Sequence, residues 1–329
     1  MATITKTIKP SGGDYTSLSA WEAGRNANLI TSGNIEVAEC YAMSDTTAVV
    51  IDGWTTDAAD YIKIYTPTSE RHVGVWNTSK YRLEVTGLVG SAAIINKESF
   101  VRIDGLQVSA SQSSSSADVI STWSVDADNC ELQFSNNILK GVSNTFGSGV
   151  YAYTGAHTGK VKIWNNIIYD LTTATGFGIY CSFNASSANF YVYNNTVKNC
   201  GYGIYNQNAT TPAKAYNTLI SGCTTAGSGT WVAGTGYNAT NNASMAYTVT
   251  GGATADRTSQ TFSFVGASDF HLTSGDAGAR DYGIDLSADA NLAFSTDIDA
   301  QTRSGSWDIG ADEYIATGVI IPSFGYVFG

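Results

Sequence analysis

The chain has 329 residues, and its 17 basic and 28 acidic side chains give a net charge of −11. This balance provides no basic surface for a phosphate backbone or for anionic lipids, so neither nucleic acid nor a membrane is an expected partner. Only 14% of the residues are charged, whereas 34 are glycine and 19 are tyrosine. Such a composition is typical of strands and tight turns, and it predicts an all-β protein.

The cysteines and the first residues of the sequence indicate whether disulfides, a zinc site or a signal peptide are expected. The five cysteines are odd in number and lack CxxC spacing, so neither a disulfide framework nor a thiolate zinc site is expected. The opening MATITKTIKPSGGDYTSL contains no apolar stretch or cleavage signal of the secretory kind. We therefore expect no signal peptide.

Residues 1–50 are predicted to hold a first strand and a short helix. Within GGDYTSLSAWEAG, residues 12–24, Ser19 and Glu22 have the spacing of a capping box, and Leu18 and Trp21 share one helical face. An amphipathic helix at this position would cover the open end of a stack of strands.

Residues 51–230 contain a repeat. Its clearest copies are IDGLQV, FSNNIL, KIWNNIIYD, VYNNTV and AYNTLI, which align on Gly105, Asn136, Asn165, Asn194 and Asn217 at intervals of 31, 29, 29 and 23 residues. A period of this length indicates a solenoid, in which each repeat forms one coil and stacks on the next.

Strand alternation assigns the repeated positions to two faces. Ile103, Phe134, Ile163 and Val192 are predicted to point into the core. The residue after each reference position is Asn137, Asn166 or Asn195 in three successive coils. A buried amide is stable only when it is paired, and equivalent amides about 4.8 Å apart along a stack pair with one another. We expect these three residues to form an asparagine ladder.

These segments resemble the right-handed parallel β-helix repeat family, the pectate-lyase-like superfamily. The opening GGDYTSLSAWEAG and the closing segments DFHLTSGDAGA (269–279) and DIDAQTRSGSWDIGADEY (297–314) are most like those of phage-associated members. The resemblance implies an all-β, right-handed parallel β-helix solenoid with a short N-terminal capping helix. It also implies an irregular C-terminal cap over residues 231–329 and a homotrimer. The apolar end IATGVIIPSFGYVFG is too short and too interrupted by proline and glycine to span a bilayer, so we expect a tail that docks on a neighbour.

The closing region is rich in acids. A Ca²⁺ site is one interpretation of these carboxylates, but EF-hand spacing is absent, and a structural role in which Arg303 pairs with one or more of them is favoured. No metal or other cofactor is therefore expected. The acids are Asp297, Asp299, Asp308, Asp312 and Glu313.

The few acids of the coils are the candidate catalytic residues. Hydrolysis of a glycosidic bond takes two carboxylates about 5–9.5 Å apart. Asp126 and Asp128 share a strand face, and Asp170 is a third candidate, although a solvated turn explains the first two better. The NTD, DD, GHG and RIK motifs of polygalacturonases are absent. His72, His157 and His271 show no metal-ligand spacing.

Outward aromatic residues form two predicted columns. Trp164, Tyr193 and Tyr216 would give a linear platform for sugar rings, but coverage by residues 225–250 or by another subunit is the favoured alternative. The same two interpretations apply to the column that consists of Tyr151, Tyr180 and Tyr205.

Three functions are compatible with these features. The first is a bacteriophage virion or appendage protein, located in a virion or outside the cell, that serves as a rigid scaffold and binds a host-surface glycan and other virion proteins. The second is a polysaccharide lyase or glycoside hydrolase with the same fold, and the third is a purely structural protein.

Overall fold

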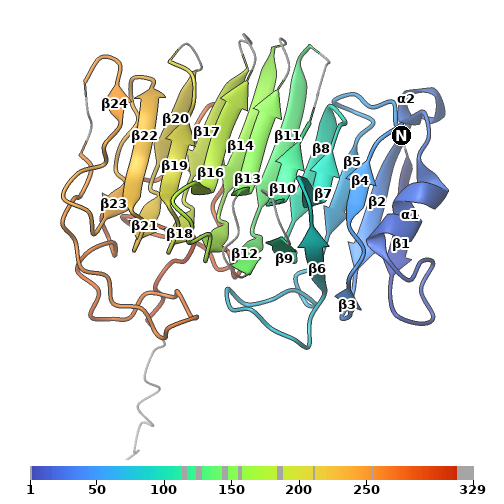
Figure 1. Ribbon diagram of the computed structural model, residues 1–329, viewed down its shortest axis with the longest axis horizontal. Coiled ribbons are helices and arrows are strands. Elements are labelled where there is room, and N and C mark those ends of the chain that lie inside the picture. The colour runs from blue at the N-terminus through green and yellow to red at the C-terminus, as the bar shows by residue number, and fades with distance from the viewer. Residues whose placement is uncertain are drawn as a thin grey trace, which may run out of the picture.

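The computed structural model describes residues 2–112, 117–123, 128–142, 147–154, 158–183, 188–209, 212–252 and 255–316. They form a right-handed parallel β-helix whose strands succeed one another along the long axis in chain order (Figure 1). Right-handed crossovers are the rule between parallel strands of one sheet. The predicted all-β solenoid is confirmed.

Three parallel sheets of eight strands each run along the solenoid. The first sheet contains β1 (Ala2–Ile8), β2 (Asn34–Cys40), β5 (Ile62–Tyr65), β8 (Phe100–Asp104), β11 (Cys130–Ser135), β14 (Gly159–Trp164), β17 (Asn189–Tyr193) and β20 (Ala213–Tyr216). The second contains β3 (Ser44–Asp45), β6 (Arg82–Leu88), β9 (Gln107–Gln112), β12 (Ile138–Val142), β15 (Ile167–Tyr169), β18 (Thr196–Lys198), β21 (Leu219–Ser221) and β23 (Ala239–Thr240).

The third sheet carries the longest strands of the central coils. It contains β4 (Val49–Ile51), β7 (Ser91–Asn96), β10 (Ala117–Thr122), β13 (Gly147–Thr154), β16 (Gly176–Phe183), β19 (Tyr202–Asn206), β22 (Thr225–Trp231) and β24 (Thr248–Val249). The stack therefore begins at β1 and ends at β24, so it extends beyond residues 51–230 on both sides.

The core follows the predicted alternation. Phe134 pairs in register with Ile103 on one side and with Ile163 on the other, and all three side chains are fully buried. The five cysteines are free and buried, and desolvation raises the pKa of the Cys130 thiol to about 11. These thiols therefore act as small apolar side chains in the core.

The two asparagines of each repeat have different roles. The first lies in the left-handed region, with φ of 54° at Asn136 and 53° at Asn165, a conformation that asparagine tolerates better than most residues. The second points inward: the Asn137 amide donates to Asn166 Oδ1 at 3.0 Å, and the Asn166 amide donates to Asn195 Oδ1 at 3.0 Å. The expected ladder is present, and its members are fully buried.

Helix α1 (Leu18–Arg25) covers the N-terminal end of the stack and is followed by the short α2 (Leu29–Ser32) (Figure 1). Leu18 and Trp21 are fully buried, as their shared face predicts. The predicted capping box is wrong, because Ser17 is the N-cap and accepts from the Ala20 amide. No helix among the described residues is long and apolar enough to cross a membrane.

The closing region, residues 255–316, has no sheet strand or helix in its described part and folds back onto the coils. The first asparagines of the repeats hold it. The Asn194 amide donates to the carbonyls of Asp308 and Gly310 at 3.2 and 3.1 Å, and the Asn217 amide donates to the Ile284 carbonyl at 2.8 Å. The predicted tail lies beyond the described residues.

Arg303 stabilises the closing region through buried polar contacts. Its guanidinium is fully buried, forms an ion pair with Glu313 at 3.1 Å and donates to the carbonyl of Ala311 and the amide oxygen of Asn165. The expected pairing of Arg303 with one of the closing carboxylates is therefore confirmed. A buried guanidinium is tolerated here because several oxygens accept its protons.

Candidate functional site

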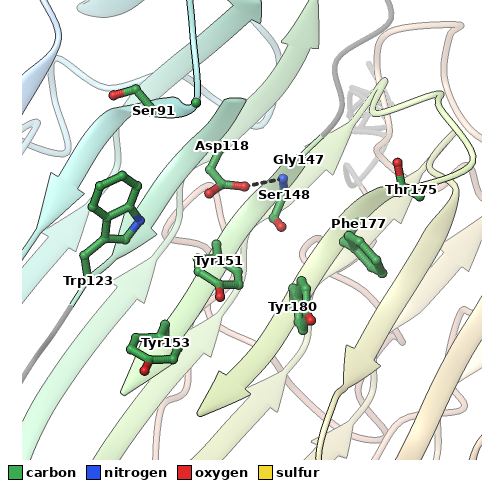
Figure 2. A pocket seen from close by; sticks show the side chains of 11 residues that line it. Ser91, Asp118, Trp123, Gly147, Ser148, Tyr151, Tyr153, Thr175, Phe177 and Tyr180 are labelled. Atoms are coloured by element: carbon green, nitrogen blue, oxygen red, sulfur yellow. Dashed lines mark hydrogen bonds between the residues drawn. The ribbon is translucent and has the colours of Figure 1, made fainter. Parts of the chain in front are cut away.

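A groove of about 590 Å³ lies on the outer face of the third sheet, across β10, β13 and β16 (Figure 2). Its lining is rich in aromatic rings and contains one carboxylate; among the described lining residues there is no lysine or arginine. The residues that give it this character are Asp118, Trp123, Tyr151, Tyr153, Phe177 and Tyr180.

Strand register places these rings side by side. Tyr151 pairs with Tyr180, and Tyr180 pairs with Tyr205, so equivalent positions of three coils form one outward column. Adjacent ring centroids are 5.1 and 5.0 Å apart. The neighbouring residues Val150 and Ile179 are fully buried, as alternation requires. The predicted column is therefore present, with its rings half-buried at the surface.

A second outward column runs beside the first. Strict alternation is interrupted in β10, β13 and β16, because two consecutive residues face the core, as Val119 and Ile120 do in β10. The outward positions that precede these pairs are Asp118, Ser148 and Phe177. Phe177 lies 4.6 Å from Tyr180 and 5.0 Å from Tyr202, measured between ring centroids. The aromatic surface thus continues along the solenoid axis from β13 to β19.

Asp118 brings the one carboxylate into this groove. It lies on β10 and accepts a hydrogen bond from the backbone amide of Ser148 at 2.6 Å, as Figure 2 shows. Desolvation raises the pKa of the Asp118 carboxyl to about 6, against an ordinary value of 3.8. A carboxyl with such a pKa exchanges its proton near neutral pH, which is a frequent property of functional sites.

The other predicted aromatic column is covered. Tyr193 is fully buried, and Trp164 and Tyr216 are half-buried against a cluster that includes Leu286 and Trp307 of the closing region. Coverage, the favoured interpretation, is therefore correct, and Trp164, Tyr193 and Tyr216 do not form the exposed glycan platform that was the other interpretation. The covering segment is 284–307 rather than 225–250, because it docks on the asparagine bends of the same coils.

The acids proposed from the sequence do not meet in one cleft. Asp126 lies outside the described residues. Asp128 is exposed at the turn before β11 and accepts from the Thr158 amide at 3.1 Å. Asp170 has a φ of 64° at the bend after β15 and accepts from the Asn199 amide at 3.2 Å. The two described acids therefore act as turn partners, and neither lines the groove.

Sequence reasoning missed Asp118 because the strand alternation changes phase beside it. A strict period of two, counted from the inward Ile120, would place Asp118 inward as well. The double inward step at Val119 and Ile120 reverses that assignment. The tyrosine column gives no signal for it either, because a residue three positions before the outward-aligned Ser121 is inward under strict alternation.

Comparisons with known proteins add little beyond architecture. No protein-family model matches the chain, and no curated protein matches it. Among solved structures, the crystal structure of pectate lyase Pel9A is similar over 96% of this chain and 97% of that chain, with 11% sequence identity and a TM-score of 0.34. A similarity of this degree carries no inference about activity.

Proposed function

We propose that this protein is a rigid β-helix scaffold that binds an extended polysaccharide along the aromatic groove of the third sheet. The observation that carries the proposal is the half-buried column of Tyr151, Tyr180 and Tyr205, with ring centroids about 5 Å apart along the solenoid axis. Aromatic faces stack on the apolar faces of sugar rings, and a column with this direction follows a linear chain.

The charge of the groove favours a neutral or amino-substituted polysaccharide. Asp118 provides a negative charge above its pKa, and the described lining residues include no cation that would pair with a uronate. The net charge of −11 acts in the same direction. A polyuronate such as pectate would meet repulsion here, whereas an amino sugar would gain an ion pair with Asp118.

Binding is favoured over cleavage, because the described lining of the groove contains a single carboxylate and glycoside hydrolysis takes two. Asp118, with a pKa near 6, is nevertheless the group that a lyase or hydrolase on this surface would use for proton transfer. A polysaccharide lyase or glycoside hydrolase therefore stays the second candidate.

The test is isothermal titration with neutral glucan, amino-sugar and polygalacturonate oligosaccharides, together with an assay for reducing ends and unsaturated products. We expect binding of a neutral or amino-substituted chain, its loss in Tyr180→Ala, and retention in Tyr282→Ala, which changes an exposed tyrosine of the closing region. Product release that disappears in Asp118→Asn would establish the enzyme. Absence of binding to every glycan class would leave a purely structural protein.

The biological setting that we propose is a bacteriophage virion or surface appendage, with a host-surface glycan as the ligand and other virion proteins as neighbours. The resemblance of the opening and closing segments to phage-associated β-helix proteins supports it. A homotrimer belongs to the same proposal. Sedimentation equilibrium of the full chain checks the trimer, and a monomer at micromolar concentration would contradict it. Selective adsorption to bacterial cells, competed by the free glycan, checks the setting.

A further inference from the structure

The closing region gathers one imidazole and three carboxylates from positions far apart in the sequence. His271 Nδ1 lies 2.5 Å from Asp269 Oδ1, and His271 Nε2 lies 2.9 Å from Asp299 Oδ2 and 4.0 Å from Asp312 Oδ1. One ligand atom of each of His271, Asp299 and Asp312 can be chosen so that all lie within 4.8 Å of one another. Asp299 and Asp312 are among the acids for which a Ca²⁺ site was one interpretation of the sequence, but no spacing linked them to His271, which lies 28 residues before Asp299.

The orientation of His271 suits a metal ligand. Asp269 takes the Nδ1 side of the ring, which directs Nε2 toward Asp299 and Asp312. A carboxylate on the far nitrogen of a ligating histidine is a recurrent arrangement, since it fixes the ring and raises its basicity. Asp269 would thus be the positioning residue, and the other three would be the ligands.

A second observation points to a missing partner. Asp299 Oδ1 is buried and has no hydrogen-bond partner among the described residues, and only 10% of the Asp299 side chain is exposed. A buried carboxylate oxygen without a partner is costly unless something neutralises it. A Cβ built on Gly74 would lie 2.9 Å from this oxygen and 2.5 Å from His271 Nε2. Both atoms therefore face the same small space, which stays free of a side chain because residue 74 is glycine.

We propose that His271, Asp299 and Asp312 bind one divalent cation of the Zn²⁺ or Mn²⁺ class. Two ligand atoms on one such ion lie at most about 4.2 Å apart, because each is about 2.1 Å from it. The separations of His271 Nε2 from the two carboxylates satisfy this limit. A nitrogen ligand together with carboxylates favours a transition metal over Ca²⁺, which prefers oxygen ligands alone.

The cation would join two separate segments of the closing region. Asp269 forms an antiparallel bridge with Val75, so the site lies where the closing region meets the 66–81 loop between β5 and β6. Its ligands come from two segments of the closing region, around residue 271 and at 299–312. Cation binding would therefore tie these two segments of the closing region to each other, independently of any glycan.

The experiment uses the full chain, stripped with chelator, dialysed, and titrated calorimetrically with Zn²⁺, Mn²⁺ and Ca²⁺. We expect one equivalent of Zn²⁺ or Mn²⁺ to bind and to raise the unfolding temperature, with Ca²⁺ at least tenfold weaker. Asp299→Asn and His271→Ala should each weaken binding at least tenfold, and Asp269→Asn should weaken it about tenfold. The matched control Asp281→Asn changes an acid that is 66% exposed in the same region, and it should bind normally.

Two further measurements keep the proposal falsifiable if a variant fails to fold. Co²⁺ bound to the unaltered protein should show visible absorption typical of a nitrogen and oxygen ligand set. Gly74→Ala, which puts a methyl group into the space, should abolish it. Absence of saturable one-to-one binding of Zn²⁺ and Mn²⁺ to the unaltered protein overturns the proposal, as does binding that Asp299→Asn leaves unchanged.

Discussion

Two aromatic columns arise from the same strand alternation, yet they have opposite surroundings. Tyr193, between Trp164 and Tyr216 on the first sheet, is fully buried beneath the closing region, whereas Tyr180, between Tyr151 and Tyr205 on the third sheet, borders an open groove. The repeat dictates the column in both cases. Its role depends on whether another part of the chain docks on it, and on the first sheet Asn194 and Asn217 donate hydrogen bonds to the closing region that docks there.

The largest effect is expected from truncation of the covered column. Tyr193→Ala removes a fully buried ring between the first sheet and the covering segment 284–307, called the cover below. It should lower the free energy of unfolding by about 3–5 kcal/mol. Guanidinium denaturation of the two proteins measures this difference. A loss below 1 kcal/mol would mean that the cover does not pack on this column in solution.

Tyr193→Phe is the matched control for that substitution. The Tyr193 hydroxyl is buried and finds no hydrogen-bond partner in the part of the chain that the structure describes, so its removal leaves the ring packing intact and deletes an uncompensated polar group. We expect equal or greater stability, by up to about 1 kcal/mol. A destabilised Tyr193→Phe would show that the hydroxyl has a partner after all.

The next effect concerns the asparagine that anchors the cover. Asn194→Gly preserves the left-handed backbone, with its φ of 48°, and removes the two hydrogen bonds to the Asp308 and Gly310 carbonyls. The free energy of unfolding should fall by about 1–3 kcal/mol, because each carbonyl keeps only Arg303 as its side-chain donor and the Asn217 amide loses Asn194 Oδ1 as an acceptor. Faster hydrogen exchange confined to residues 284–310 would show that the loss lies in the cover. Uniform change across the coils would contradict the anchoring role.

The open column should respond in affinity instead of stability. Tyr180→Ala is expected to weaken binding of the cognate glycan about tenfold, or about 1.4 kcal/mol, while unfolding changes little. Tyr180→Phe keeps the ring and should retain most of the affinity. Calorimetric titration of both variants separates stacking from hydroxyl hydrogen bonding, and equal losses in the two would argue against stacking.

The sequence predicted the architecture well because the repeat carries it. The ladder is predictable from identity and spacing alone, because asparagine recurs at positions 137, 166 and 195. The core is predictable from strand alternation, as at Phe134 and Ile163. The groove was only half predictable. Its tyrosine column follows from spacing, but Asp118 depends on a local double inward step that no period reveals.

The closing region was the least predictable part. Its contacts join residues more than 100 positions apart, as between Asn194 and Gly310, and no repeat links the two sides. The cover over Trp164 and the meeting of His271 with Asp299 both depend on how that irregular segment folds back. Local pattern therefore fixes the coils, whereas long-range docking decides which of their surfaces stay open.

The smallest expected effect is on the pH dependence of stability, and it tests whether the Asp118 carboxylate in the open groove lowers the free energy of unfolding. Asp118 is protonated more readily in the folded protein, with its pKa raised to about 6 from 3.8 by desolvation. The folded state therefore retains this proton when the unfolded state has lost it. The contribution of Asp118 to stability is fully present below pH 4, decreases as the pH rises to about 6, and is constant above.

Asp118→Asn should abolish this dependence. Asparagine can still accept from the Ser148 amide, and it carries no charge to desolvate. Because Asp118 is only partly buried, solvent reduces the penalty, and we expect the variant to be about 1 kcal/mol more stable than the unaltered protein at pH 8 and equally stable at pH 4. Thermal unfolding across this range measures the difference. Equal slopes for the two proteins would mean that the carboxylate is fully hydrated, and the groove would then retain it at no cost.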